Sequence, residues 1–422
     1  MEETPGALLA LNDEALLERV ARRTFGFFWE GAEPISGMAR DRSTTTADPP
    51  GDLVAVGGSG FGLMALVAAV ERGWVNRADA LARLDRMLAC LERAERHHGA
   101  FPHFLHGATG KTIPFSAQDD GGDLVETSFL MMGLLTARQY FADQGKLAAR
   151  ISALWDGVEW TWYRKGENVL YWHWSPNFGW AMTHAIRGWS ETLITYVLAA
   201  GAPEPISCEV YEQGFCAGPD YANGKNYYGV RLPLGPELGG PLFFAHYSFL
   251  GLDPRGLRDA HADYWRQNLA QLAINRAHCL ANPGRFKGYG AHCWGLTASD
   301  DPSGYAAHAP GNDNGTISPT AALSSFPYAP EACFAALRHL LAAHGEEIWG
   351  RFGFTDAFNE TRDWWADTFL AIDQGPIIVM IENYRSQLLW KLFMSAPEVQ
   401  RGLRRLGFHG PEQRPGADRP GA

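Results

Sequence analysis

The sequence has little cysteine, and its cysteines form no metal or redox motif. Six occur among 422 residues, and none forms a C-x-x-C pair. This spacing indicates neither a zinc ribbon nor a dithiol redox centre. Buried free thiols are therefore the expected state of these residues. They are Cys90, Cys208, Cys216, Cys279, Cys293 and Cys333.

Basic runs are also missing, and the net charge is −11 at pH 7. A chain with this balance is a poor binder of nucleic acid, so we expect no nucleic-acid partner. Charged residues make up only 20% of the chain and hydrophobic residues 46%, which excludes intrinsic disorder of the whole chain.

No secretory signal is legible, because a basic n-region is absent and Ala7–Leu11 is too short for a hydrophobic region. We expect a cytoplasmic protein, or a soluble periplasmic or secreted one whose signal was removed. The segment Leu53–Val70 has 18 residues without a charge, which just meets the length of a membrane span. Its glycines instead favour a glycine-rich loop that leads into a short buried helix, so no membrane partner is expected.

Helical periodicity dominates, no βαβ alternation appears, and no composition shift marks a domain boundary. We expect an all-α chain with about twelve helices, only isolated strand signals at Val169–Trp172 and Leu242–Phe244, one catalytic domain over residues 1–410, and a disordered polar tail over 411–422. This count and the long Gly/Pro-rich loops suit six helical hairpins closed into an (α/α)6 toroid, whose rim loops form one cleft. The longer expected helices are Gly60–Arg72, Glu126–Tyr140, Leu147–Trp162, Arg187–Ala200, Asp259–Leu280, Pro330–Ala343, Thr361–Leu370 and Gln374–Ala396.

Aromatic residues are abundant, with 15 Trp, 14 Tyr and 23 Phe. Together with the excess of carboxylates they suit an aromatic-lined cleft that contains acids, although aromatic-rich cores share this composition. The densest run is Tyr171–Trp180. Indole rings stack on the apolar faces of pyranoses while polar side chains bind hydroxyls. The candidates for these contacts in and near the run are Trp172, His173, Trp174, Asn177, Trp180, Arg187 and Trp189.

One acidic motif is shared with a different enzyme class. Asp119, Asp120 and Asp123 match the D-D-x-x-D magnesium motif of terpene synthases, which are also all-α. The second magnesium motif of those enzymes fails here, because Thr320 stands where a glutamate is needed. The histidines between 97 and 106 lack any helical H-E-x-x-H spacing. We therefore expect no metal site and no cofactor.

Carboxylates are crowded where this motif meets the next helix. Asp119, Asp120, Asp123 and Glu126 lie around two glycines, and Asp123 and Glu126 share one helical face. Interaction with a helix N-terminus explains one or two of these acids, but not four. Such crowding is typical of a polyol site, a cation site or an acid with a raised pKa.

Three more acids lie in apolar surroundings. Glu191 is near the start of an apolar helix, Asp373 precedes the apolar run Ile377–Ile381, and Glu382 follows it, close to Tyr384. Simple alternatives exist for each of these acids: Asp373 as a helix cap and Glu382 as the ion-pair partner of a nearby arginine.

These motifs resemble a known family. The segments Gly57–Gly62, Gly99–His103, Asp119–Leu135, Tyr171–Trp180, Gly240–Pro254, Gly288–Pro310, Gly315–Phe326 and Asp373–Trp390 closely resemble the bacterial glucoamylase-like domain family, glycoside hydrolase family 144, whose characterised members act on β-1,2-glucan. The resemblance spans residues 13–408.

The resemblance implies an (α/α)6 toroid and inverting hydrolysis by paired carboxylates without a cofactor. The family's acids correspond to Asp119, Asp123, Glu126, Glu191 and Asp373. Among these, Glu191 resembles the proton donor and Asp373 the residue that activates water, through a proton relay or directly. Two further substrate-binding candidates, His246 and Trp294, come from the matching segments, in addition to Glu382 and Tyr384.

The resulting hypothesis is a hydrolase of β-1,2-glucan, endo or exo, that releases sophorose or short sophoro-oligosaccharides. Its partner is then a β-glucan oligo- or polysaccharide. Two alternatives stay open: a β-1,2-glucosyl transferase or hydrolase of another, cyclic β-glucan, and a non-catalytic glucan-binding protein.

Overall fold

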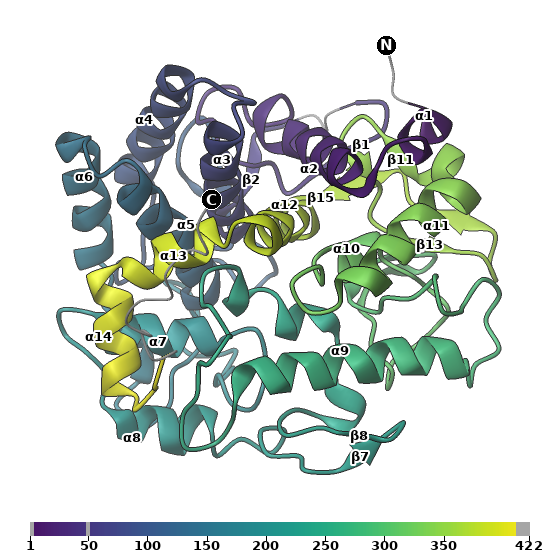
Figure 1. Cartoon of the computed structure of the whole chain (residues 1–422). Coiled ribbons are helices and arrows are strands. Elements are labelled where there is room, and N and C mark those ends of the chain that lie inside the picture. The colour runs from purple at the N-terminus through teal and green to yellow at the C-terminus, as the bar shows by residue number, and fades with distance from the viewer. Residues whose placement is uncertain (1–3, 48–50, 411–422) are drawn as a thin grey trace, which may run out of the picture.

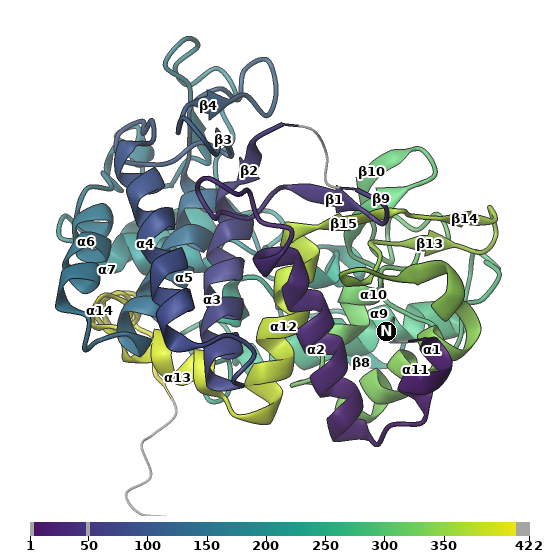
Figure 2. The same cartoon turned by 90° about the horizontal axis from the view of Figure 1, so that it is seen from above.

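Helices are the main secondary structure of the molecule (Figure 1). Many of the short antiparallel strands gather at one of its ends (Figure 2). This computed structural model describes residues 4–47 and 51–410, so the expected tail over 411–422 lies outside the described residues. Within the described part of the chain, no helix is long and apolar enough to cross a membrane.

Three buried helices form the centre: α3 packs against α5, and α12 packs against α3. Each begins directly at the end of a short strand, so their N-termini lie at the end of the molecule where the strands gather (Figure 2). The strand–helix pairs are β2 (Leu53–Ala55) with α3 (Val56–Glu71), β5 (Gly122–Asp123) with α5 (Leu124–Tyr140), and β15 (Thr368–Leu370) with α12 (Ala371–Arg385).

Gly57 and Gly58, which we expected in a loop before the helix Gly60–Arg72, belong to the first turn of α3, so the helix begins earlier than predicted. A Cβ on Gly60 would lie 2.1 Å from the carbonyl oxygen of Phe129, and a Cβ on Gly133 would lie 2.1 Å from the carbonyl oxygen of Gly60. The glycines therefore allow the backbones of α3 and α5 to touch. Close packing outweighs the low helix propensity of glycine here.

The remaining helices surround this centre, and α2 runs beside α12. They are α1 (Pro5–Leu9), α2 (Asp13–Trp29), α4 (Arg77–Arg93), α6 (Gly145–Asp156), α7 (Leu193–Gly201), α8 (Cys208–Val210), α9 (Tyr264–Ala281), α10 (Pro319–Leu323), α11 (Pro330–Ile348), α13 (Leu388–Ser395) and α14 (Pro397–Arg405).

Several expected boundaries are wrong. The chain between 361 and 370 contains strands rather than a helix, and the helix expected over Gln374–Ala396 is divided where Gln387 adopts a φ of 62°. The expected strand Leu242–Phe244 is a 3-10 turn, Leu242–Ala245, and the strand expected at Val169–Trp172 lies slightly later, at β6 (His173–Trp174). Short apolar runs carry too little periodicity to separate these states.

The strands pair in small antiparallel sheets. Strand β1 (Arg42–Thr44) pairs with β15, β5 with β6, and β2 with β3 (Phe104–His106). The other pairings are β3 with β4 (Thr112–Ile113), β7 (Asn226–Tyr227) with β8 (Val230–Arg231), β9 (Ala298–Asp301) with β10 (Gly304–Ala307), β11 (Trp349–Gly350) with β12 (Gly353–Phe354), and β13 (Phe358–Asn359) with β14 (Trp364–Trp365).

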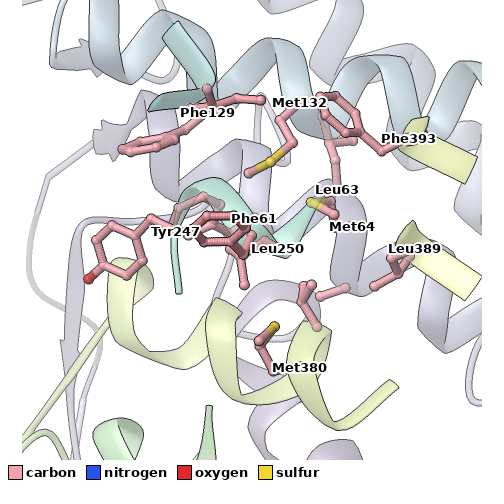
Figure 3. Packing of buried hydrophobic residues seen from close by; sticks show 14 of the residues in the cluster. Phe61, Leu63, Met64, Phe129, Met132, Tyr247, Leu250, Met380, Leu389 and Phe393 are labelled. Carbon is pink, nitrogen blue, oxygen red and sulfur yellow. The ribbon is translucent and has the colours of Figure 1, made fainter. Parts of the chain in front are cut away.

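One hydrophobic core extends from Leu8 to Phe408. Near the inner helices, Phe61 and Phe129 lie 5.2 Å apart between ring centroids, and Tyr247 packs against both. Figure 3 shows that the Tyr247 hydroxyl points away from this cluster. The ring of Tyr247 therefore belongs to the core, while its hydroxyl lies outside this cluster.

Candidate active site

A cavity of about 400 Å³ opens where α5 and α12 begin. Its volume is within the usual range for small-molecule sites. The wall combines charged and aromatic side chains with a few aliphatic ones. The lining residues are Asp41, Arg42, Ala55, His103, Phe104, Phe115, Glu126, Tyr305, Leu370 and Ile372.

Asp123 is the N-cap of α5 and is completely buried. Its Oδ1 accepts hydrogen bonds from the backbone N–H groups of Val125 and Glu126 at 2.9 and 2.8 Å. Its Oδ2 lies 3.2 Å from His103 Nδ1 and accepts the indole N–H of Trp172 at 3.1 Å. With four neighbours, Asp123 orients both His103 and the helix that carries Glu126.

Glu126 lies on the cavity wall, and its Oε2 accepts the backbone N–H of Gly57 at 2.7 Å. Burial raises the pKa of Glu126 to about 7, against the opposing effect of His103. Burial also opposes the charge on His103, but Glu126, Asp123 and Asp119 raise its pKa to about 9. A protonated His103 therefore faces a carboxyl group that titrates near neutrality.

The other two acids of this loop contact the aromatic run. Buried Asp119 places its Oδ1 3.1 Å from His173 Nε2. Asp120 accepts hydrogen bonds from Ser175 and from the amide of Asn177. Both acids thus connect the loop to the strand β6 and the turn after it, rather than projecting freely into solvent.

Glu191 lies two residues before α7, where we had expected it inside a helix. The Ser248 hydroxyl donates to the Glu191 carbonyl and accepts the N–H of Ile194 at 3.0 Å, which fixes this backbone. Burial, together with the smaller effect of the charges of Glu126 and Asp123, raises the pKa of Glu191 to about 7. Its carboxyl group therefore holds a proton up to about neutral pH.

Asp373 is in the first turn of α12 and Leu370 is the N-cap, so capping does not explain this buried acid. Its carboxyl group acts on that of Asp356, and both side chains are buried. Burial and then Asp356 raise the pKa of Asp373 well above its usual range. Burial and the neighbouring Asp300 raise the pKa of Asp356 to about 7.

Charged and polar neighbours surround this aspartate pair. The Asp300 N–H donates to Asp356 Oδ2 at 2.7 Å. The Asp300 carboxylate accepts the Thr368 hydroxyl at 2.6 Å and contacts Arg42 at 3.3 Å. In the pairing of β1 with β15, Arg42 lies opposite Leu370 and Thr368 lies opposite Thr44. Arg42 contacts Asp300 and acts electrostatically on Asp356.

The tryptophans of the run Tyr171–Trp180 are half-buried beside the acidic loop. Trp172 stacks on His184 with ring centroids 4.9 Å apart, and Trp174 contacts His98 edge-on. Trp180 packs edge-on against Tyr171. Trp172 donates a hydrogen bond to Asp123. None of these three tryptophans is among the residues that line the cavity.

Six other candidate sugar-binding residues are not among those that line this cavity. Trp189 is buried and donates to Gln271, His246 contacts Ser325 in the core, and Trp294 is only 1% exposed. The others are also engaged: Arg187 donates to the Gln213 carbonyl, Glu382 forms an ion pair with Arg72 rather than with Arg385, and Tyr384 packs on Phe326.

The cavity also contains residues that motif reasoning missed. Phe115 and Tyr305 are more than half exposed and belong to the wall, which suits them to stack on sugar rings. His103 was noticed only as a possible metal ligand. Asp356 was not considered. The only signal that the sequence offers for these two aromatics is their position directly after a proline or a glycine, which indicates a loop.

The fold and the site together define an α-helical protein in which Glu126, from the first turn of α5, lines the cavity, and the buried acids Glu191 and Asp373 lie near the starts of α7 and α12. A family model described as "Glycoamylase: Putative glucoamylase" matches residues 183–397. The chain belongs to this glucoamylase-like family, glycoside hydrolase family 144, as the sequence motifs predicted.

Relatives with known names support this assignment. The chain is 46% identical over 425 residues to an exo-β-1,2-glucooligosaccharide sophorohydrolase of Parabacteroides distasonis. The aligned region covers 94% of this chain and 58% of that protein. The chain thus spans little more than half of this curated relative. An endo-β-1,2-glucanase of Chitinophaga pinensis, solved with sophorotriose and glucose, is 53% identical with a TM-score of 0.93, covering 95% of this chain and 100% of that one. A β-1,2-glucanase of Parabacteroides distasonis is 45% identical with a TM-score of 0.90, covering 94% and 60%.

Proposed function

We propose that this chain hydrolyses the β-1,2-glucosidic bonds of β-1,2-glucan with inversion at the anomeric carbon. One observation carries the proposal: the two buried carboxyl groups of Glu191 and Asp373 both have raised pKa values and both act electrostatically on the Tyr247 hydroxyl. An inverting glycosidase needs such a pair, with one acid at the leaving oxygen and one base at the water.

In the proposed mechanism, Glu191 donates its proton to the glycosidic oxygen as the bond breaks. A carboxylic acid with a pKa of about 7 is neutral often enough to do this at physiological pH. Burial keeps the group protonated, and Ser248 fixes the backbone from which it projects.

Water activation is assigned to Asp373 through a relay with Asp356. The pair carries one proton when Asp356 is ionised, and Asp373 Oδ2 is buried with no hydrogen-bond partner. As water attacks the anomeric carbon, Asp373 takes the water proton and passes its own proton to Asp356. Arg42 offsets part of the negative charge that Asp356 carries before the transfer.

The remaining acids and aromatics bind the sugar. Glu126 and protonated His103 form a polar wall for hydroxyl groups, and Phe115 and Tyr305 supply stacking faces. Asp119 and Asp123 hold His173, His103 and Trp172 in position. We further propose that residues 1–410 form one catalytic domain with the (α/α)6 toroid architecture, supported by the main hydrophobic cluster, which extends from Leu8 to Phe408, and by the shared fold.

A product profile on linear β-1,2-glucan tests the function. Sophorose alone indicates exo cleavage, and a ladder of sophoro-oligosaccharides indicates endo cleavage. Products longer than the substrate indicate transfer, and full binding without turnover indicates a glucan-binding protein. The variants Glu191→Gln and Asp373→Asn should each lose turnover, with exposed Glu204→Gln as the control. Full turnover in both would refute the assignment of the acids.

A further inference from the structure

Away from the cavity, a cysteine and two histidines converge from separate segments. One ligand atom each of Cys293, His339 and His344 lies within 4.8 Å of the others. Cys293 is in the loop between α9 and β9, and both histidines are on α11, with ring centroids 5.7 Å apart. Bonds of about 2.0–2.3 Å around one zinc ion place ligand atoms within about 4.6 Å of each other. The three side chains are thus close to coordinating distance.

The environment of His344 points independently to a ligand. This histidine is only 7% exposed, and its Nε2 makes no hydrogen bond. Glu360, from the turn between β13 and β14, places Oε1 3.2 Å from this nitrogen without hydrogen-bond geometry. The ring is enclosed by Phe358 and Trp365. Buried polar atoms usually have partners, so this nitrogen requires an explanation.

We propose that Cys293, His339 and His344 bind a thiophilic divalent cation, Zn²⁺ in chemical class, with Glu360 beside His344. Thiolate and imidazole ligands together favour zinc over magnesium or calcium. The Glu360 carboxylate, 3.2 Å from His344 Nε2, adds negative charge beside the cation. The ion would join the loop after α9 to α11 and to the β13–β14 hairpin.

Proton balance in this site is simple. Burial raises the pKa of the Cys293 thiol, so without metal the sulfur keeps its proton. Burial lowers the pKa of His339, so its imidazole is neutral and free to coordinate. Metal binding then releases the thiol proton to solvent as the metal–sulfur bond forms. Both the metal and its affinity are therefore measurable without any enzymatic assay.

A second cluster, Glu212, Cys216 and His261, provides the internal comparison. Two of its groups are already paired, because His261 Nε2 lies 2.8 Å from Glu212 Oε2. His261 is also exposed. This cluster is more open and better satisfied, so we assign the metal to the Cys293 cluster.

The test is titration of the chelator-treated full chain with Co²⁺, whose bond to a thiolate gives a near-ultraviolet charge-transfer band. The wild type should bind one equivalent with this band. Cys293→Ser should lose the band, and Cys216→Ser should keep it. His339→Gln changes a half-buried side chain, leaves the thiol in place, and should weaken binding about tenfold or more. Glu360→Gln removes only the neighbouring negative charge and should weaken binding by a smaller factor.

A folding defect caused by the loss of Cys293 can be distinguished from the loss of a metal ligand, because His339→Gln and Glu360→Gln both leave Cys293 in place. Zinc should also raise the Tm of Cys216→Ser, but that of His339→Gln much less. Absence of the band in the wild type would overturn the proposal. Loss of the band in Cys216→Ser with retention in Cys293→Ser would overturn it equally, since the metal would then occupy the second cluster.

Discussion

Replacing Glu191 by Gln should remove activity and at the same time stabilise the protein at alkaline pH. In the folded chain burial raises the pKa of Glu191 from 4.5 to about 7. The folded pKa lies above the unfolded one, so this group stabilises the protein most below pH 4.5, and that contribution is lost as the pH rises through 7. The full difference corresponds to about 3 kcal/mol.

Glutamine resembles the neutral acid at every pH and does not undergo this loss. The free energy of unfolding of Glu191→Gln, relative to wild type, should therefore rise by about 2.5 kcal/mol between pH 5 and pH 8. All other titrating groups are shared and cancel in this difference. Turnover should fall by about 10²–10⁴-fold, as expected for loss of a general acid.

Urea unfolding of both proteins at pH 5 and pH 8 measures the stability difference, and initial rates of glucan hydrolysis measure turnover. The exposed Glu204→Gln is the matched control and should change neither quantity. If the relative stability of Glu191→Gln is the same at both pH values, the pKa of Glu191 is not raised and the reasoning is refuted.

Three other changes test separate parts of the structure. Asp373→Asn should abolish turnover yet increase stability at pH 8, because a neutral side chain relieves repulsion by Asp356; denaturant unfolding that showed a loss at pH 8 instead would contradict the raised pKa. Gly60→Ala should destabilise the fold by about 1–3 kcal/mol in thermal unfolding because its Cβ meets the Phe129 carbonyl, whereas Gly145→Ala, with open space around it, should not. Glu382→Gln should cost about 1 kcal/mol, because it removes the carboxylate that pairs with the partly exposed Arg72, with KM unchanged; a raised KM would restore Glu382 as a substrate ligand.

The acids could be found from the sequence because they stand beside glycines or apolar runs at helix starts. Asp123, Glu126 and Asp373 all lie in first turns or caps, where local spacing is informative. The partners of these acids could not be found in the same way. Asp356 reaches Asp373 only through the folding of the β13–β15 region, and no local pattern records that contact.

Aromatic residues show the same limit. Local sequence does not separate a tryptophan that packs in the core, such as Trp294, from an exposed ring on the cavity wall, such as Tyr305. The start of helix α3 was expected at Gly60 rather than at Val56 for a related reason. Its glycines are unfavourable locally, and the benefit of close contact with α5 appears only in three dimensions.

The most direct test of the central claim is the anomeric form of the first product released from linear β-1,2-glucan, followed by NMR before mutarotation. The account predicts that the wild type releases the α-anomer first and that Glu191→Gln releases none at a comparable rate. A β-anomer as the first product would contradict inversion, and absence of any release by the wild type would contradict the proposed substrate.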